Sequence, residues 1–319
     1  MTRVTVIIPA FNASRYIATA IGSVRDGSEP DVEILVADDA STDDTVACVA
    51  AIAARDDQVR LIPSAVNAGP GAARNRALAE ARGDWVAVLD ADDQYHPDRL
   101  RSLLDLAQRF GADVVSDNLM LCRDASEEPM IPASSLPEAK ILEATEFVER
   151  NIVRRGQPRV SYGFMKPVIR RSFLLDHDIR YEEGRFAEDY IFGLTMLLAG
   201  ATWTVSPEPL YRYTVRPGSL TESHSPHDLS WLIEAERRLL DHPRVRAGAK
   251  LRSAMQAHLR SVEMAMNWEN FAIGIKSRDL WLTAGSLVAH PGSVVHICRE
   301  TALALPRAVT KLISRLQTR

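Results

Sequence analysis

The sequence predicts an α/β protein in which a mostly parallel sheet is flanked by helices. Strand and helix signals alternate regularly over the first 120 residues. The strand segments are nearly continuous apolar runs, which is typical of parallel strands covered on both faces. Beyond residue 225 the pattern becomes helical. The chain is therefore expected to combine an α/β sheet domain with a helical C-terminal extension.

Five strands and four helices are expected in order along the first part of the chain. The strands are predicted at residues 4–8, 32–37, 59–63, 85–89 and 113–116. The helices between them are predicted at residues 14–24, 43–55, 71–81 and 98–110. Ser41 or Thr42 lies near the cap of the second helix, and Pro97 lies at the start of the fourth. Ligands of such sheets bind where the strands end.

The later elements are less regular. A loop is expected at residues 123–137, where the chain is acidic and contains Pro and Ser. Further strands are expected at 166–170, 203–205 and 210–213, and a helix at 190–199. We therefore divide the chain into residues 1–222, which form the sheet domain, and residues 223–319, which form the helical region.

The composition is that of an ordinary globular protein, with 46% hydrophobic and 25% charged residues. The net charge of −4 gives no general attraction to nucleic acid. Three cysteines are too few and too scattered for a disulfide framework or a zinc site, which favours a reducing compartment. The chain runs from its start directly into a strand, so no signal peptide is expected and the expected location is cytoplasmic.

The C-terminal part has two unusual stretches. Residues 280–298 contain no Asp, Glu, Lys or Arg, but His290-Pro291-Gly292 interrupts them, which favours helix, turn and helix over a membrane span. Residues 291–319 contain five Lys or Arg against one Glu, with apolar and basic residues on different faces of a helix. This pattern fits an amphipathic helix on an anionic membrane surface, or a helix packed on the protein's own body.

An acidic cluster follows the fourth predicted strand. Asp90, Asp92 and Asp93 come directly after an apolar run. Like charges repel and burial penalises each of them, so the cluster is favourable when a cation binds there. Hard carboxylate oxygens suit Mg²⁺ or Mn²⁺, and such an ion keeps open positions for substrate phosphates. The alternative is an acidic turn before the helix that begins near Pro97. The first interpretation predicts a metal-assisted enzyme that acts on a nucleotide diphosphate compound.

Polar, turn-forming segments also follow the other three strands, at the same edge of the predicted parallel sheet. They are Pro9, Ala10 and Asn12 after the first strand, Asp38 and Asp39 after the second, and Asn67 and Arg74 after the third. Because parallel strands end at one edge, these groups are expected to converge into one pocket. A carboxylate of the Asp pair can bind a base or a ribose hydroxyl, or it can cap a helix.

Two further motifs bear on the chemistry. Gly69-Pro70-Gly71 superficially resembles a dinucleotide-binding loop, but it follows the third strand and its last glycine position holds Arg74. Glu188 and Asp189 lie where the 190–199 helix begins. A helix N-terminus stabilises carboxylates as anions, which explains the pair structurally, while a carboxylate beside a substrate is also a candidate general base.

Taken together, the motifs resemble those of the family 2 glycosyltransferases. They are Pro-Ala-Phe-Asn at 9–12, Asp-Asp-Ala-Ser-Thr-Asp at 38–43, Asn-Ala-Gly at 67–69, Ala-Ala-Arg-Asn at 72–75, Asp-Ala-Asp-Asp at 90–93 and Glu-Asp at 188–189. The resemblance covers residues 3–220 and implies the GT-A (Rossmann-like) fold, a nucleotide-sugar donor and inversion at the anomeric carbon. Phe11 and Ala40 stand where the family usually has Tyr and Gly, and neither position must supply a polar side chain.

The resemblance also implies a role for each motif residue. Asp189 would be the catalytic base, with Glu188 supporting it or binding the acceptor. Asp92 would be the direct ligand of Mn²⁺ or Mg²⁺. The donor-binding set would be Pro9, Ala10, Asn12, Asp38, Asp39, Asn67, Arg74, Asp90 and Ala91. Within this set, Asp39 and Arg74 would hold the base, and Asp90 would contact the ribose or a metal-bound water.

Two basic pairs remain open. Arg212 and Arg216 lie in a segment with Gly and Pro, which fits a lid over the diphosphate or an ordinary surface hairpin. Lys166 and Arg170 either face an acceptor that carries phosphate or are solvated strand residues.

The expected function is transfer of one sugar from a nucleotide-diphosphate donor, with UDP-sugar as the default. The acceptor would be a glycan or lipid-linked glycan in bacterial surface polysaccharide assembly. Two alternatives are kept. An inactive sugar-nucleotide-binding relative would lack Asp92 or Asp189, and both are present. A nucleotidyltransferase would have a basic loop after the first strand, where Pro-Ala-Phe-Asn stands instead.

Overall fold

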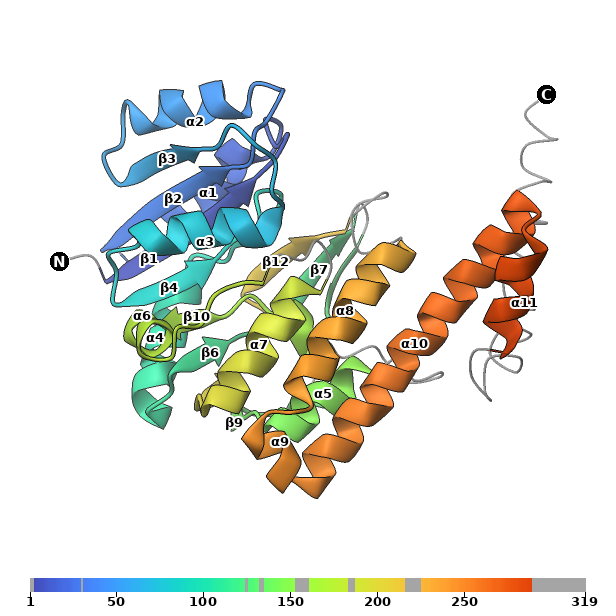
Figure 1. Cartoon of the computed structure of the whole chain (residues 1–319). Coiled ribbons are helices and arrows are strands. Elements are labelled where there is room, and N and C mark those ends of the chain that lie inside the picture. The colour runs from blue at the N-terminus through green and yellow to red at the C-terminus, as the bar shows by residue number, and fades with distance from the viewer. Residues whose placement is uncertain are drawn as a thin grey trace.

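The computed structural model describes residues 3–29, 31–123, 126–131, 135–152, 161–182, 187–215 and 225–288. It shows a twisted central sheet with helices on both faces and a long helical arm that extends away from it (Figure 1). The predicted α/β class with a helical C-terminal part is confirmed. The predicted amphipathic helix at 305–316 lies outside the described residues.

Within the described ranges, the large sheet has eight strands. In spatial order they are β3 (Val59–Pro63), β2 (Val32–Asp38), β1 (Val4–Ala10), β4 (Trp85–Val88), β10 (Val168–Arg170), β6 (Val114–Ser116), β11 (Trp203–Val205) and β9 (Lys140–Ile141). Strands β3, β2, β1 and β4 are mutually parallel. Strand β10 runs antiparallel between β4 and β6, so the second half of the sheet is mixed. The four expected strand ends therefore do lie at one edge.

Both faces of the sheet are covered, which explains the nearly continuous apolar strands. Val6 and Ile8 of β1 pack with helices α1 (Ile17–Arg25), α2 (Thr45–Ala53) and α4 (Arg99–Phe110). Ile7, between them, points to the opposite face and packs against α3 (Pro70–Glu80). The period of two along the strand thus supplies apolar side chains to two separate cores.

The remaining helices are α5 (Ala144–Asn151), α6 (Arg171–Asp176), α7 (Glu188–Ala199), α8 (Pro226–Leu239), α9 (Pro243–Ala247), α10 (Ala249–Ser277) and α11 (Leu280–Val288), with a 3₁₀ turn at Tyr162–Phe164. The predicted helices before residue 120 agree with the structure to within three residues at each end. The helical pattern after residue 225 is confirmed up to Val288.

A second, four-stranded sheet corrects one prediction. Its order is β5 (Gln94–Tyr95), β12 (Tyr211–Thr214), β7 (Leu119–Arg123) and β8 (Ser126–Pro129). The expected loop at 123–137 is therefore wrong for β8. All four residues of β8 are exposed, so no apolar alternation marks this edge strand, and backbone pairing with β7 holds it. In β12, the buried Tyr211 connects this sheet to the acidic loop after β4.

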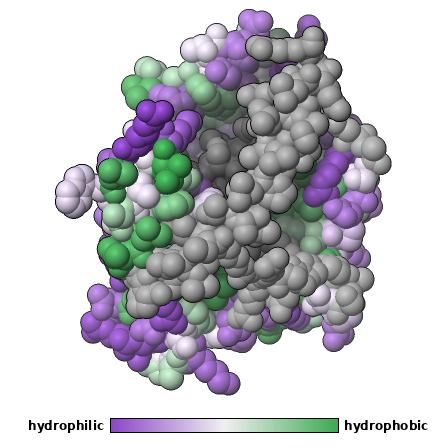
Figure 2. All heavy atoms as spheres, turned by 90° about the vertical axis from the view of Figure 1, so that its right-hand side faces the viewer, coloured by the Kyte–Doolittle hydropathy of each residue, from purple (hydrophilic) through white to green (hydrophobic). Residues whose placement is uncertain are grey.

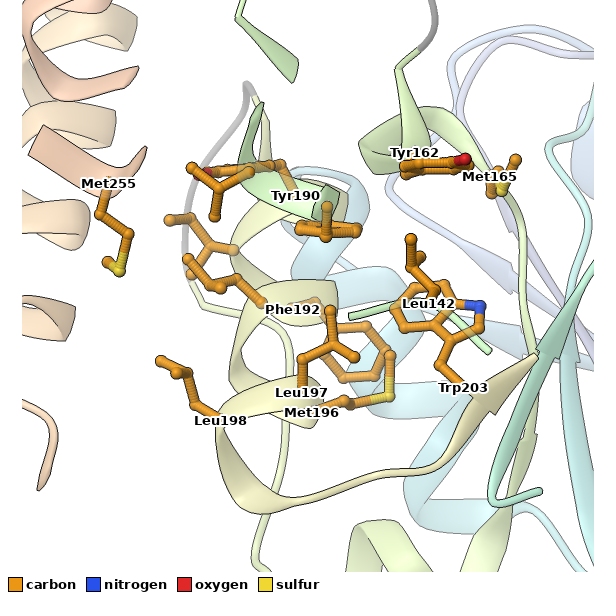
Figure 3. Close-up of a cluster of buried hydrophobic side chains, with 14 of the residues drawn as sticks. Leu142, Tyr162, Met165, Tyr190, Phe192, Met196, Leu197, Leu198, Trp203 and Met255 are labelled. Carbon is orange, nitrogen blue, oxygen red and sulfur yellow. The ribbon is translucent and has the colours of Figure 1, made fainter. Parts of the chain in front are cut away.

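The C-terminal helices share a core with the second half of the sheet. Phe147 of α5 stacks on Tyr190 of α7 and contacts Trp203 of β11. Met255 of α10 belongs to the same cluster and points toward the α7 side chains (Figure 3). Helices α8 and α10 are thus attached to the second half of the sheet through buried contacts. Among the described helices, none combines the length and the hydropathy needed to cross a bilayer.

Candidate active site

The loops after β1 and β2 are joined to each other by side-chain hydrogen bonds. The Asn12 N–H donates to Ser41 Oγ at 2.9 Å, and the Thr42 N–H donates to Asn12 Oδ1 at 2.8 Å. Two non-glycine residues, Asn12 (φ 50°) and Ala40 (φ 63°), adopt left-handed backbone conformations. Such strain persists where surrounding contacts enforce it, and it concentrates at functional sites. The left-handed backbone at Ala40 is a physical reason for the glycine that the family 2 glycosyltransferases, which this sequence resembles, usually have at this position.

Asp39 holds the third loop against the second. Its carboxylate, 3% exposed, accepts a hydrogen bond from the Gly69 N–H at 2.7 Å and pairs with Arg76 at 3.0 Å. The Asn67 amide donates to the Asp39 backbone carbonyl at 3.1 Å. Asp39 is therefore occupied by the protein itself, and its role toward a base stays a prediction.

Asp38 has spare hydrogen-bonding capacity. One carboxylate oxygen accepts from the Ser41 N–H at 3.0 Å, while its buried Oδ1 has no partner among the described residues. An unpaired buried acceptor costs free energy unless a ligand satisfies it. Neither Asp38 nor Asp39 caps α2. The N-cap residue of that helix is Asp44, and the carboxylate that accepts the Thr45 N–H, at 3.0 Å, is that of Asp43.

The centre of the site is a cluster of two cations and three carboxylates, which we call the charge cluster: Arg74, Lys166, Asp90, Glu188 and Asp189. Arg74 from α3 pairs with Asp90 at 2.9 Å and with Glu188 at 2.7 Å. It also reaches Asp189 at 3.1 Å. Lys166 pairs with Asp90 at 2.9 Å and with Asp189 at 2.5 Å. The two predicted acidic motifs, 98 positions apart in the chain at residues 90 and 188, thus meet in space.

Burial makes these interactions strong. The side chains of Arg74 and Lys166 are 3% and 5% exposed. Burial opposes the charge of each cation, but the neighbouring carboxylates outweigh it, so the pKa of Arg74 and that of Lys166 are raised. The pKa of Asp90 is lowered: burial opposes this shift, and the charges of Lys166 and Arg74 outweigh it. Burial and the charge of Asp189 raise the pKa of Glu188.

The backbone at residues 181 and 182 is held against α3. Asn75 exchanges two hydrogen bonds with the Tyr181 backbone, at 2.8 and 2.9 Å. A Cβ at Gly71 would lie 2.9 Å from the Glu182 carbonyl oxygen, so only glycine allows this approach. The Tyr181 ring then lies 5.1 Å from the Arg74 guanidinium. The Ala-Ala-Arg-Asn motif therefore serves two purposes: Arg74 supplies a cation, and Asn75 anchors the backbone of Tyr181.

In the acidic loop after β4, Asp93 has a structural role. Asp93, 1% exposed, accepts hydrogen bonds from Tyr211 Oη at 2.8 Å and from the Thr214 N–H at 2.7 Å. Burial and the charge of Asp90 raise the pKa of Asp93 to about 7. Asp93 thus ties the loop to β12, whereas Asp92 is half-buried and Ala91 is buried.

The residues of this loop fit a divalent ion of the kind that a substrate helps to bind. Among the described residues, no group of three or more His, Cys, Asp or Glu side chains could hold a metal by itself. Mg²⁺ is commonly bound through one or two carboxylates plus substrate phosphates. Asp92, with Asp90 beside it, supplies that donor set in hard oxygen ligands.

Lys166 is the main residue that the sequence interpretation left undecided. It comes just before β10, and β10 lies between β4 and β6, so the ammonium falls between the acidic loop and α7. Arg170 behaves differently: its guanidinium covers the Trp85 ring at 4.7 Å. The available signal was a lysine just before an apolar strand, but the sequence did not show where that strand lies in the sheet.

The predicted lid is only partly within the described residues. Arg212 lies in β12 and forms an ion pair with Glu127 of β8, which is separated from β12 by β7 in the small sheet. Arg216 lies outside the described residues, as do residues 184–186 before the Glu-Asp motif. The lid therefore stays a prediction.

Comparison with known proteins places this geometry in context. The family model described as "Glycosyl transferase family 2" matches residues 5–174. The succinoglycan biosynthesis protein ExoO of Rhizobium meliloti (strain 1021) is 32% identical over 312 residues, which span 97% of this chain and 88% of ExoO. ExoU, a second succinoglycan biosynthesis protein of that organism, is 34% identical over 298 residues, spanning 92% of this chain and 85% of ExoU.

Solved structures show the same fold. S. aureus TarS 1–349 in complex with UDP-GlcNAc has a TM-score of 0.63 at 19% identity, covering 89% of this chain and 90% of TarS 1–349. The mannosyltransferase PcManGT from Pyrobaculum calidifontis, in complex with GDP-Man and Mn²⁺, has a TM-score of 0.55 at 19% identity, covering 95% of this chain and 80% of PcManGT. At such identities the likeness concerns the fold alone.

Proposed function

This chain belongs to glycosyl transferase family 2, and we propose that it transfers one sugar from a nucleotide-diphosphate donor to an acceptor hydroxyl in bacterial polysaccharide assembly. The default donor is a UDP-sugar, and the transfer inverts the anomeric carbon. The acceptor is a glycan or a lipid-linked glycan. The succinoglycan names of ExoO and ExoU support the polysaccharide context.

The observation that carries the proposal is the charge cluster. It places Asp189, the base implied by the family motif, against Lys166 at 2.5 Å, and Lys166 in turn contacts Asp90 of the acidic loop at 2.9 Å. A proton acceptor and a donor-binding loop are thus held in one site. Positioning of this kind supplies much of the rate of a group transfer.

We assign the steps to this chain's residues as follows. The acceptor oxygen bonds to the anomeric carbon as the bond from that carbon to the donor phosphate breaks, and the diphosphate leaves with the electron pair. Asp189 takes the acceptor proton. Arg74 and Lys166 fix both Asp189 oxygens during this transfer. A divalent ion held by Asp92, with Asp90 beside it, would neutralise charge on the departing diphosphate.

The first test is a thermal-shift panel of UDP, GDP, dTDP and CDP with and without Mn²⁺. We expect one nucleotide to stabilise the protein in the presence of Mn²⁺, by about 2.7 kcal/mol at a ligand concentration of about 100 Kd. Asp92→Ala should abolish the shift. Asp98→Ala is the matched control, because the Asp98 side chain is 62% exposed and lies outside the charge cluster.

The second test separates binding from chemistry. Asp189→Asn should keep the nucleotide-dependent shift and lose donor turnover by about 10²-fold or more, since a proton acceptor is removed. If no nucleotide shifts the wild-type melting temperature, the inactive sugar-nucleotide-binding relative becomes the better description. Binding without any turnover in wild type would favour that alternative as well. Nucleotide binding that does not respond to Mn²⁺ would remove the metal from the proposal.

A further inference from the structure

Helix α11 leaves large apolar side chains at both of its ends exposed to solvent. Of its nine residues, the buried one is Ser286. Leu280, Trp281 and Val288 are 81%, 90% and 82% exposed. An ordinary surface helix turns its apolar stripe toward the core, so this arrangement leaves a large apolar surface without a partner in the described structure.

This arrangement is fixed by the turn between α10 and α11. A Cβ at Gly274 would lie 2.5 Å from Thr283 Oγ1, so glycine is required for α11 to lie against the end of α10. Arg278 adopts the left-handed conformation that ends α10, with φ 59°. Asp279 Oδ1 then accepts the N–H groups of Trp281 and Leu282, both at 3.0 Å. The exposure of the first turn of α11 therefore follows from a defined local structure.

Two apolar side chains near the end of α10 are also exposed. Ile273 and Ile275 near the end of that helix are 41% and 59% exposed. Figure 1 places α11 at the end of the helical arm, away from the central sheet. Figure 2 views this end of the molecule and shows hydrophobic side chains gathered next to hydrophilic ones. We call Ile273, Ile275, Leu280, Trp281 and Val288 the arm-tip patch.

The charges around the arm-tip patch indicate what covers it. Residues 280–298 contain no charged side chain. Lys276, Arg278 and the single acid Asp279 precede this stretch, and in the sequence residues 299–319 add five Lys or Arg against one Glu. An uncharged apolar surface bordered by basic residues complements an anionic lipid bilayer, in which apolar groups enter the interface and cations meet the head groups. Tryptophan is favoured at that depth.

We propose that the arm-tip patch is a docking site for an anionic membrane surface, with Leu280 and Trp281 as the side chains that enter the lipid interface. The proposal does not depend on the sugar or the nucleotide. It goes beyond the proposed function because it concerns a surface on the opposite end of the molecule from β1–β4. A second copy of the chain and the chain's own C-terminal residues are the competing occupants, and the test distinguishes them.

The experiment is co-sedimentation of the full chain with vesicles of phosphatidylcholine alone and of phosphatidylcholine with phosphatidylglycerol. Binding to the anionic vesicles is expected, and it should fall about tenfold or more for Leu280→Ser combined with Trp281→Ser. Because both side chains are more than 80% exposed, the variant should keep the wild-type melting temperature. The matched control combines Val66→Ser with Leu175→Ser, at positions 67% and 62% exposed elsewhere on the surface.

The proposal is overturned if the wild-type protein does not bind anionic vesicles. It is also overturned if the arm-tip variant, which combines Leu280→Ser with Trp281→Ser, binds them as strongly as the wild-type protein does. Binding that survives the variant but is lost at high salt would assign the attachment to the basic C-terminal residues instead. A wild-type dimer in solution that dissociates in the arm-tip variant, without vesicle binding, would assign the patch to a second copy. The nucleotide thermal shift is measured in parallel, so failure of membrane binding is distinguishable from failure of the donor site.

Discussion

The Lys166 ammonium lies between two carboxylates that come from distant parts of the chain. It contacts Asp90 and Asp189, and its side chain is 5% exposed. A buried ion pair is weak evidence for stability by itself, but removing one partner leaves an uncompensated charge in a medium of low polarity. We therefore expect the loss of Lys166 to lower both the stability of the protein and its ligand binding.

We expect Lys166→Met to lower the free energy of unfolding by about 3–5 kcal/mol, because Asp90 and Asp189 lose one of the two buried cations that they share and keep only Arg74. Urea denaturation measures this value. Adding Asp90→Asn should recover part of the loss, since one uncompensated carboxylate disappears. Lys140→Met is the matched control: its pair with Glu146 is partly exposed and should change stability by about 1 kcal/mol or less. Equal losses for the two lysine variants would contradict the assignment.

Ala40 offers a second test at the residue scale, because it holds a left-handed backbone with φ 63°. Glycine adopts this conformation without the Cβ conflict of about 1–2 kcal/mol, although it has more unfolded-state entropy to lose. Ala40→Gly should therefore be neutral or stabilising by up to about 1 kcal/mol. The same change at Ala51, inside α2, should cost about 1 kcal/mol. Thermal unfolding of both variants checks the opposite signs.

At the scale of elements, the start of α2 is tied to the loop after β1. Asp43 accepts hydrogen bonds from the Thr45 hydroxyl at 2.5 Å and from the Ser14 N–H at 3.1 Å. The Thr45 hydroxyl oxygen in turn accepts the Ala13 N–H at 2.8 Å. These bonds to the ionised carboxylate, that from Thr45 first, lower the pKa of Asp43 to about 2. This hydrogen-bond network holds the edge of the sheet that carries the residues proposed to bind the nucleotide-sugar donor.

The lowered pKa of Asp43 predicts a pH dependence with a definite sign. The stabilisation is fully present above the unfolded-state value of 3.8 and is lost as the pH falls toward about 2. Asp43→Asn should therefore be less stable than wild type near pH 6, and the difference should shrink between about pH 4 and pH 2. Urea unfolding of both proteins across this range tests it. A difference that stays constant with pH would contradict the assignment.

At the scale of the whole molecule, one core joins the sheet and the C-terminal helices. Met255 of α10 is fully buried in the cluster that contains Tyr190 and Trp203. Tyr190 directly follows Asp189, so packing of the helical region bears on the helix that carries the proposed base. The division at residue 222 stays a prediction about sequence segments, and these contacts favour joint unfolding.

Met255→Ala should destabilise the protein by about 2–5 kcal/mol through the cavity it leaves. Because the core is shared, the unfolding followed by circular dichroism and by loss of nucleotide binding should move together. Leu175→Ala, at a side chain 62% exposed, is the control and should change stability by less than about 0.5 kcal/mol. Two separate transitions, with only the first shifted by Met255→Ala, would show that the regions unfold independently.

The sequence by itself determined the order of β1 to β4, the helices between them and the family motifs. These features depend on local periodicity and on residues close together in the chain, such as Pro97 just before α4. It also identified Arg74, Asp90, Glu188 and Asp189 as one site. The edge strand β8 was missed, because its four exposed residues carry no alternating pattern.

Only the tertiary structure decided which charges face one another. Strand β10 enters the sheet antiparallel, and that placement, which no local pattern reports, brings Lys166 between Asp90 and Asp189. The same holds for Asp93, which has the residue type of a metal ligand but is turned inward to Tyr211. The exposed face of α11 likewise follows from its contact with α10. The sequence supplies several candidate side chains, and the pairing of strands that are far apart in the chain decides which of them meet. This is because burial and charge partners are properties of the folded chain.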